Sequence, residues 1–192
     1  MNDSPRLLLG QRGLRREAAN ASIVRRPSLA IPVMTTPAPL ASAGVRFPPP
    51  FVYALGILAG WLVDRRWRWA ITAHPAPWRP VVAVVLILGW LTLFVAAAAH
   101  FRRAGTSIIP NQPASAFVVS GPYHFTRNPM YVSLALLYLG IALILNSWWI
   151  VALLPVVLIV IQLTVIAREE RYLRQRFPVD YPAYCSRVRR WL

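Results

Sequence analysis

The stretch MYVSLALLYLGIALILNSWWIVALLPVVLIVIQLTVIA, residues 130–167, contains no charged side chain and is interrupted near its middle by the polar pair Asn146-Ser147. Its two apolar parts, Met130–Leu145 and Trp148–Ala167, approach the length at which a helix crosses a bilayer, about 20 residues at about 1.5 Å each. A connection of two residues makes neighbouring helices antiparallel. The sequence therefore predicts a tight helical hairpin in a membrane, with its tryptophan pair at the interface of the tip.

Two further apolar segments, Phe47–Val63 and Val81–Ala99, precede this hairpin. The first carries Gly56-x-x-x-Gly60, a spacing that either lets two helices approach closely or is merely tolerated in an apolar helix. Four such segments predict an all-α integral membrane protein with about four transmembrane helices, formed by residues 47–192. Beyond Ala167 the helical pattern continues to about Phe177, which predicts a cytoplasmic C-terminal helix followed by a tail.

The chain carries a net charge of +15, and its 21 basic residues are all arginine. The arginines lie in the tails and between the apolar segments, as in membrane proteins, and this distribution argues against nucleic-acid binding. Each tail holds seven arginines. We therefore expect both termini on the cytoplasmic side of an inner or plasma membrane, with membrane lipids as partners, although the arginines of the first loop then face outward. The oligomeric state stays open.

Residues 1–46 combine arginine, proline and small residues, which predicts a disordered basic tail. Its apolar run RLLLG is shorter than the apolar core of a signal peptide, about 7–15 residues. The single cysteine, Cys185, offers neither a disulfide framework nor a zinc site. The absence of lysine excludes Schiff-base and P-loop chemistry.

The segment SGPYHFTRNPMY, residues 120–131, leads directly into the hairpin. Asn128 followed by Pro129 is a favoured start for a helix, at the N-cap and the first helical position. A helix N-terminus also presents free N–H groups and a partial positive charge to an anion. With Arg127 beside it and two tyrosines nearby, this segment is either only a well-made helix start or a site for a ligand with a carboxylate, a cation and a flat ring.

Two of the six acidic residues, Glu169 and Glu170, are adjacent and follow the last apolar segment. Neighbouring helical residues point about 100° apart, so the two carboxylates cannot act as a close pair. Glu170 can form a surface ion pair with Arg174 at i,i+4. Because the hairpin is tight, we expect Glu169 to return to the level of Asn128, where an acid at a membrane boundary indicates function.

Together, SGPYHFTRNPMY, the apolar hairpin and REERYLRQRFPVDYPAY resemble the isoprenylcysteine carboxyl methyltransferases and the related phospholipid N-methyltransferases. These are integral membrane enzymes that use S-adenosylmethionine. The resemblance implies a cofactor-binding core over residues 115–192, a catalytic role for Arg127, and Arg168 as the candidate substrate contact. Val165 stands where the prenylcysteine enzymes carry a substrate-binding arginine. The implied cofactor-binding residues are Phe117, Val118, Tyr123, Asn128, Pro129, Met130, Tyr131, Glu169 and Glu170.

The implied reaction is methyl transfer to a lipophilic or membrane-associated acceptor, foremost carboxyl methylation of an isoprenylcysteine-like substrate. Two alternatives are a phospholipid or small-molecule N-, O- or S-methyltransferase and a non-catalytic membrane scaffold. In-line transfer requires the acceptor lone pair to be held close to the methyl group and kept dry, so no enzyme nucleophile is needed. An amine acceptor would need a base, for which the candidates at neutral pH are His74, His100 and His124.

Overall fold

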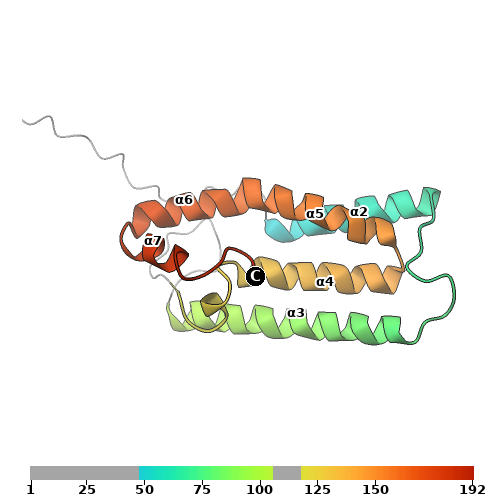
Figure 1. The fold of residues 1–192 in the computed structure, drawn as a ribbon, viewed down its shortest axis with the longest axis horizontal. Coiled ribbons are helices and arrows are strands. Elements are labelled where there is room, and N and C mark those ends of the chain that lie inside the picture. The colour runs from blue at the N-terminus through green and yellow to red at the C-terminus, as the bar shows by residue number, and fades with distance from the viewer. Residues whose placement is uncertain (1–47, 106–117) are drawn as a thin grey trace, which may run out of the picture. The chain divides into compact units, whose positions relative to one another are not determined.

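The computed structural model describes residues 48–105 and 118–192, which are helical and contain no strand. The basic tail over residues 1–46 and the predicted cofactor residue Phe117 lie outside the described residues. The all-α prediction is confirmed for this part of the chain (Figure 1). In order, the elements are α2 (Pro49–Arg66), α3 (Trp78–Arg103), the 3-10 turn η1 (Gly121–His124), α4 (Pro129–Leu145), α5 (Trp148–Ile161), the π-helical segment η2 (Gln162–Ile166), α6 (Ala167–Arg176) and α7 (Asp180–Cys185).

The predicted hairpin is formed by α4 and α5, which meet at the turn Asn146-Ser147. Asn146 takes the left-handed conformation, with φ of 55°, that commonly ends a helix. Its side-chain amide exchanges two hydrogen bonds of 3.0 Å with the backbone of Thr72, and the Trp148 N–H donates to the Trp69 carbonyl at 2.9 Å. The first loop is thereby fastened to the hairpin tip.

Within residues 48–105 and 118–192, two helices are long and apolar enough to cross a membrane, α3 with 26 residues and the continuous Trp148–Arg176 with 29. The valines and leucines of α3 are exposed rather than buried, with Val81 at 61%, Val85 at 61% and Leu88 at 56%. An apolar surface of this extent is typical of contact with lipid or a partner. Helix α4 is shorter, at 17 residues, and α2 ends in charged residues, so the four crossings stay a prediction.

The helices approach closely where the chain places glycine. A Cβ on Gly60 would lie 2.8 Å from the Ile150 Cα, and one on Gly56 would lie 2.4 Å from a Val157 methyl group. The Gly56-x-x-x-Gly60 spacing therefore serves close packing of α2 on α5, the first of its two possible interpretations. Around this contact, Tyr138, Ile150 and Ile161 form a fully buried core.

We predict that Gly60→Ala lowers the free energy of unfolding by about 2 kcal/mol, because the new methyl group meets backbone that cannot rotate away. Thermal or denaturant unfolding of the purified protein in detergent measures the change. Gly89→Ala in α3 is the matched control, since its Cβ would meet only a Leu136 methyl group at 3.5 Å. Equal effects of the two substitutions would contradict this packing.

The segment η2 is an irregular turn within the long helix that begins at Trp148. Proline inside a helix commonly kinks it, and Pro155 lies inside α5, but the irregular turn follows at Gln162–Ile166. There the Thr164 hydroxyl donates to the Val160 carbonyl at 2.7 Å. A π-helical turn adds a residue to the helix and shifts the direction of the side chains that follow, which include both glutamates; such turns often occur at functional sites.

Candidate functional site

Glu169 meets the first turn of α4, as its position after the hairpin predicts. The Tyr131 hydroxyl donates to the Glu169 Oε1 at 2.7 Å. Tyr131 is buried, and its backbone carbonyl accepts a hydrogen bond of 2.9 Å from the Tyr53 hydroxyl of α2. The half-buried Glu169 carboxylate is thus held in place at the end of the bundle where α4 begins.

Glu170 has a different environment, because it is buried and lies between two arginines. Its Oε1 accepts from the Arg127 Nη1 at 3.2 Å and from the Arg190 Nε at 2.8 Å, and its Oε2 accepts from the Arg190 Nη2 at 2.7 Å. These hydrogen bonds raise the pKa of the Arg190 guanidinium above its ordinary value. The expected surface pair with Arg174 is wrong, since Glu170 turns inward and Arg174 stacks over the Tyr181 ring at 5.9 Å.

The last residues of the chain, 187–192, here called the C-terminal strap, lie against the start of α4 (Figure 1). The Arg190 carbonyl accepts hydrogen bonds from the Asn128 amide at 2.9 Å and from the Thr126 hydroxyl at 3.2 Å. Asn128 therefore occupies the predicted N-cap position, but its side chain bonds the strap instead of capping the helix. The Trp191 indole N–H donates to the Gln162 side chain in η2 at 3.1 Å.

Three of the predicted cofactor residues, Val118, Tyr123 and Met130, pack together in one apolar cluster against α3. The Tyr123 ring lies 5.3 Å from the Phe101 ring, and its backbone carbonyl accepts from the Tyr184 hydroxyl at 2.6 Å. Burial, with a smaller contribution from the nearby charge of Glu169, raises the pKa of Tyr123 well above its ordinary value. The cluster therefore forms an apolar and aromatic wall close to Glu169.

The loop that presents Tyr123 requires glycine at position 121. Gly121 has a φ of 63°, and a Cβ there would lie 2.3 Å from the His100 ring. The His100 Nδ1 lies 2.8 Å from the Ala96 carbonyl, within its own helix. His124 is exposed beside Phe125, and His74 lies in the loop fastened to the hairpin tip. The structure thus gives Glu169, rather than a histidine, the position next to Tyr131.

Some N–H groups of Arg127 have a hydrogen-bond acceptor and one does not. Its Nη1 contacts the Cys185 sulfur at 2.9 Å as well as Glu170, and its backbone N–H donates to the Arg189 carbonyl at 3.0 Å. Its Nε is buried, and it has no hydrogen-bond acceptor among the residues that the structure describes. A buried donor without an acceptor costs about 1–3 kcal/mol, so this N–H is suited to an anionic ligand.

The structure separates the predicted residues into three groups. Tyr131 and Glu169 pair directly, with buried Pro129 at the start of the same helical turn, and the apolar cluster lies beside them. Arg127, Asn128 and Glu170 join the C-terminal strap. Arg168 is exposed on α6.

Sequence reasoning missed the residues that reach this site from the end of the chain. Arg190, Tyr184 and Trp191 contact positions 20 to 64 residues away. No local pattern marks such partners, because a tail of arginines and aromatics is equally suited to a membrane surface. Two residues could have been found from their positions: Thr126 lies inside the segment SGPYHFTRNPMY, and Tyr184 ends the segment REERYLRQRFPVDYPAY.

A family model described as phospholipid methyltransferase matches residues 78–179, more than half of the 192-residue chain. The chain belongs to this family. The match runs from the start of α3 to just beyond α6, so it contains both glutamates, Tyr131 and Arg127, but neither α2 nor the C-terminal strap. No curated protein and no solved structure matched the chain.

Membership of the phospholipid methyltransferase family makes the protein a relative of methyltransferases that typically use S-adenosylmethionine. The residues present fit such a cofactor. Its ammonium or ribose hydroxyl groups match the acceptor oxygens of Glu169, its carboxylate matches the unpaired N–H of Arg127, and its adenine matches the wall around Tyr123. The two long apolar helices agree with a protein associated with membranes.

Proposed function

We propose that the protein transfers a methyl group from S-adenosylmethionine to a lipid acceptor, at the end of the bundle where α4 begins. The Tyr131–Glu169 pair carries this proposal, because it places a half-buried carboxylate beside an aromatic wall within the part of the chain that the family model matches. The bound cofactor supplies an electrophilic methyl group on a sulfonium. The protein supplies position and dryness, which are the main requirements of an in-line transfer.

Each residue then has a distinct role. Glu169, oriented by Tyr131, accepts hydrogen bonds from the polar part of the cofactor, and the Nε of Arg127 donates to its carboxylate. Tyr123, Val118 and Met130 exclude water from one side. Asn128 and Glu170 act less directly, by fixing the C-terminal strap against the start of α4.

Two acceptor classes remain, a carboxylate such as that of a prenylcysteine and an amine such as that of a phospholipid headgroup. The geometry favours the amine. The guanidinium groups of Arg127 and Arg190 are both bonded to Glu170, while the Glu169 carboxylate would repel an anionic acceptor and attract a cationic one. The same carboxylate can accept the proton that the headgroup ammonium must lose before its nitrogen lone pair attacks the methyl group. Val165, where the prenylcysteine enzymes have an arginine, is buried at 1% exposure and offers no charge.

We also propose that α2, α3, α4 and the helix from α5 to α6 all cross the membrane, with both termini in the cytoplasm. The Glu169 end of the bundle then faces the cytoplasm, where S-adenosylmethionine is made. Cysteine labelling by a membrane-impermeant reagent, with single cysteines placed at Thr72 and at Gln175, tests this orientation. Labelling of position 72 from the outside and of position 175 only after lysis is the expected result.

Incubation of the purified protein with radiolabelled S-adenosylmethionine tests the reaction and the acceptor together. We expect label in a phospholipid with a primary amine headgroup and none in a prenylcysteine analogue. The opposite result would reject the amine class and leave methyl transfer standing. Absence of both label and calorimetric binding of the cofactor would instead support the non-catalytic scaffold.

A further inference from the structure

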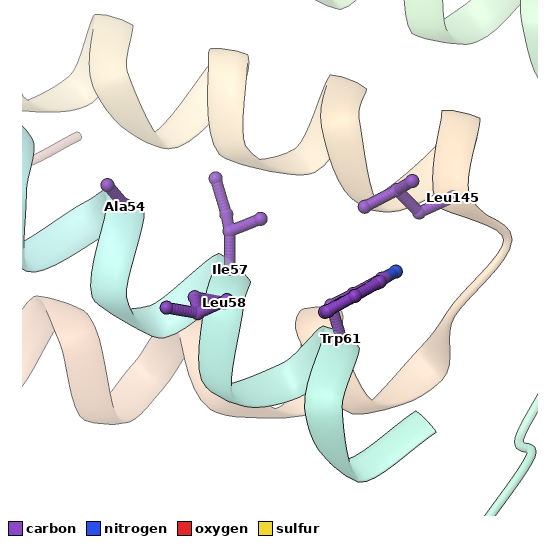
Figure 2. A pocket seen from close by; sticks show the side chains of 5 residues that line it. All are labelled: Ala54, Ile57, Leu58, Trp61 and Leu145. Carbon is purple, nitrogen blue, oxygen red and sulfur yellow. The ribbon is translucent and has the colours of Figure 1, made fainter. Parts of the chain in front are cut away.

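An open groove runs along α2 from Ala54 to Trp61 (Figure 2). Its other side is Leu145, the last residue of α4, which lies about 24 Å along α4 from Pro129 at about 1.5 Å per residue. All of its lining side chains are apolar, and they come from Ala54, Ile57, Leu58, Trp61 and Leu145. The groove contains none of the residues assigned to methyl transfer.

One end of this groove carries a positive charge. The guanidinium of Arg65 lies over the Trp61 ring at 5.3 Å from its centre, so the same indole lines the groove and supports a cation. Arg65 is exposed, and Arg66 stacks in the same way over Trp67 at 5.2 Å. A cation over an indole face is a stabilising arrangement that leaves its N–H groups available.

No other charge on the described residues of this end offsets the arginines. Asp64 is the only acidic residue between Glu17 and Glu169, and it is buried and bonded to Arg68 and to the backbone N–H of Trp69. Arg65 and Arg66 therefore present their charge outward, and Arg65 does so over the indole that lines the apolar groove. A cation beside an apolar groove is complementary to a molecule that has an anionic headgroup and a hydrocarbon chain.

We propose that this groove binds one acyl chain of an anionic phospholipid, whose phosphate is held by Arg65 beside Trp61. Ala54 precedes Trp61 by about 10 Å along the helix, so the chain would run from the interface toward the bilayer centre. The proposal rests on the membrane position of α2 and not on methyl transfer. It also accounts for the arginines of the first loop. Positive residues usually lie on cytoplasmic loops, whereas this loop is proposed to face outward.

A second copy of the chain is a poorer occupant than a lipid. A two-fold dimer places the same surface of each subunit against the other, so the groove of one copy would meet the groove of its partner. The Arg65 and Arg66 pairs would then approach each other without an acid between them. An anionic headgroup removes this repulsion, and each arginine near a charged membrane surface contributes about 1 kcal/mol to lipid binding.

Native mass spectrometry of the delipidated protein, titrated with phosphatidylglycerol or with phosphatidylcholine, tests the proposal. We expect wild type to bind phosphatidylglycerol more tightly. Arg65→Gln should weaken that binding about fivefold and the binding of phosphatidylcholine less, because the choline cation already offsets the charge of its phosphate, while Arg65→Lys keeps the preference. Ala54→Trp, which fills the groove from an exposed position, should weaken both lipids.

Arg171→Gln is the matched control, because Arg171 is exposed on α6 at the other end of the bundle. It should bind both lipids as wild type does. Unchanged binding in Arg65→Gln or in Ala54→Trp would overturn the proposal, and so would a dimer that Ala54→Trp dissociates. Methyl transfer, measured on the same samples, should be equal in all of these variants, so its failure in wild type would count against the proposed function alone.

Discussion

Glu169→Gln should raise the dissociation constant for S-adenosylmethionine by about 10- to 100-fold and leave the free energy of unfolding nearly unchanged. Hydrogen bonds to a charged group are worth about 1.5–3 kcal/mol, and each 1.4 kcal/mol is a factor of about ten in affinity. The stability should hold because Gln keeps the shape of the side chain and still accepts the hydrogen bond from the Tyr131 hydroxyl.

Isothermal titration calorimetry of the detergent-solubilised protein measures this effect, with thermal unfolding of the same sample as the measure of stability. Tyr131→Phe removes only the hydrogen bond that orients Glu169, so it should weaken cofactor binding by about fivefold, in line with about 1 kcal/mol for one such bond. Arg171→Gln controls for a change of charge on α6. If Glu169→Gln bound the cofactor as well as wild type, Glu169 would not belong to the site.

The two adjacent glutamates have different roles in the proposed site. Their side chains leave the helix about 100° apart, and the structure directs Glu169 to Tyr131 and Glu170 to two arginines. Of the two, Glu169 keeps the greater acceptor capacity for a ligand, because Glu170 already accepts three hydrogen bonds from arginine. The resemblance to known methyltransferases assigned both to cofactor binding; the geometry supports a ligand role for the first and a positioning role for the second.

Local patterns were sufficient to predict the hairpin, the end of α6 near Phe177 and the return of Glu169 to the start of α4. Each of these follows from hydrophobic length, turn residues or helix geometry over a short span. The anchoring of residues 187–192 was not predictable, because it depends on carbonyl groups and arginines meeting across tens of residues. Asn128 illustrates the difference: its position as N-cap follows from the neighbouring proline, whereas its hydrogen bond to the Arg190 carbonyl does not.

The π-helical segment was missed for another reason. Gln162–Ile166 is an apolar sequence that would fit a regular helix equally well, and nothing in its composition indicates an extra residue in the turn. The contact between the Trp191 indole and the Gln162 side chain comes from the same distant strap. The sequence therefore predicted the angle of about 100° between the two glutamate side chains, but not the direction in which either of them points.

Glu170→Ala should have the largest effect on stability, lowering the free energy of unfolding by about 3 kcal/mol. Removing one partner from a buried ionic group costs about 3–5 kcal/mol, because the remaining charge is left without compensation. Arg127 is that remaining charge, with only 13% of its side chain exposed. The lower end of the range applies, since Arg190 is 40% exposed and can turn to water.

The same substitution should release the C-terminal strap, because Arg190 loses both of its charged hydrogen bonds. Hydrogen exchange of the amides in residues 187–192 measures this release, and denaturant unfolding measures the stability. Asp180→Ala is the matched control, an exposed acid on α7 whose loss should cost less than about 1 kcal/mol. Cofactor affinity should fall in Glu170→Ala together with stability, in contrast to Glu169→Gln, where only affinity falls.

A double substitution separates the contribution of the ion pair from that of the strap. Arg190→Ala combined with Glu170→Ala should cost less than the sum of the two single substitutions, because the pair can be broken only once. Arg190→Ala alone should be milder than Glu170→Ala, since Glu170 keeps its bond to the Arg127 Nη1 at 3.2 Å. Additive costs, or a Glu170→Ala protein as stable as Asp180→Ala, would show that Glu170 does not hold the strap in place.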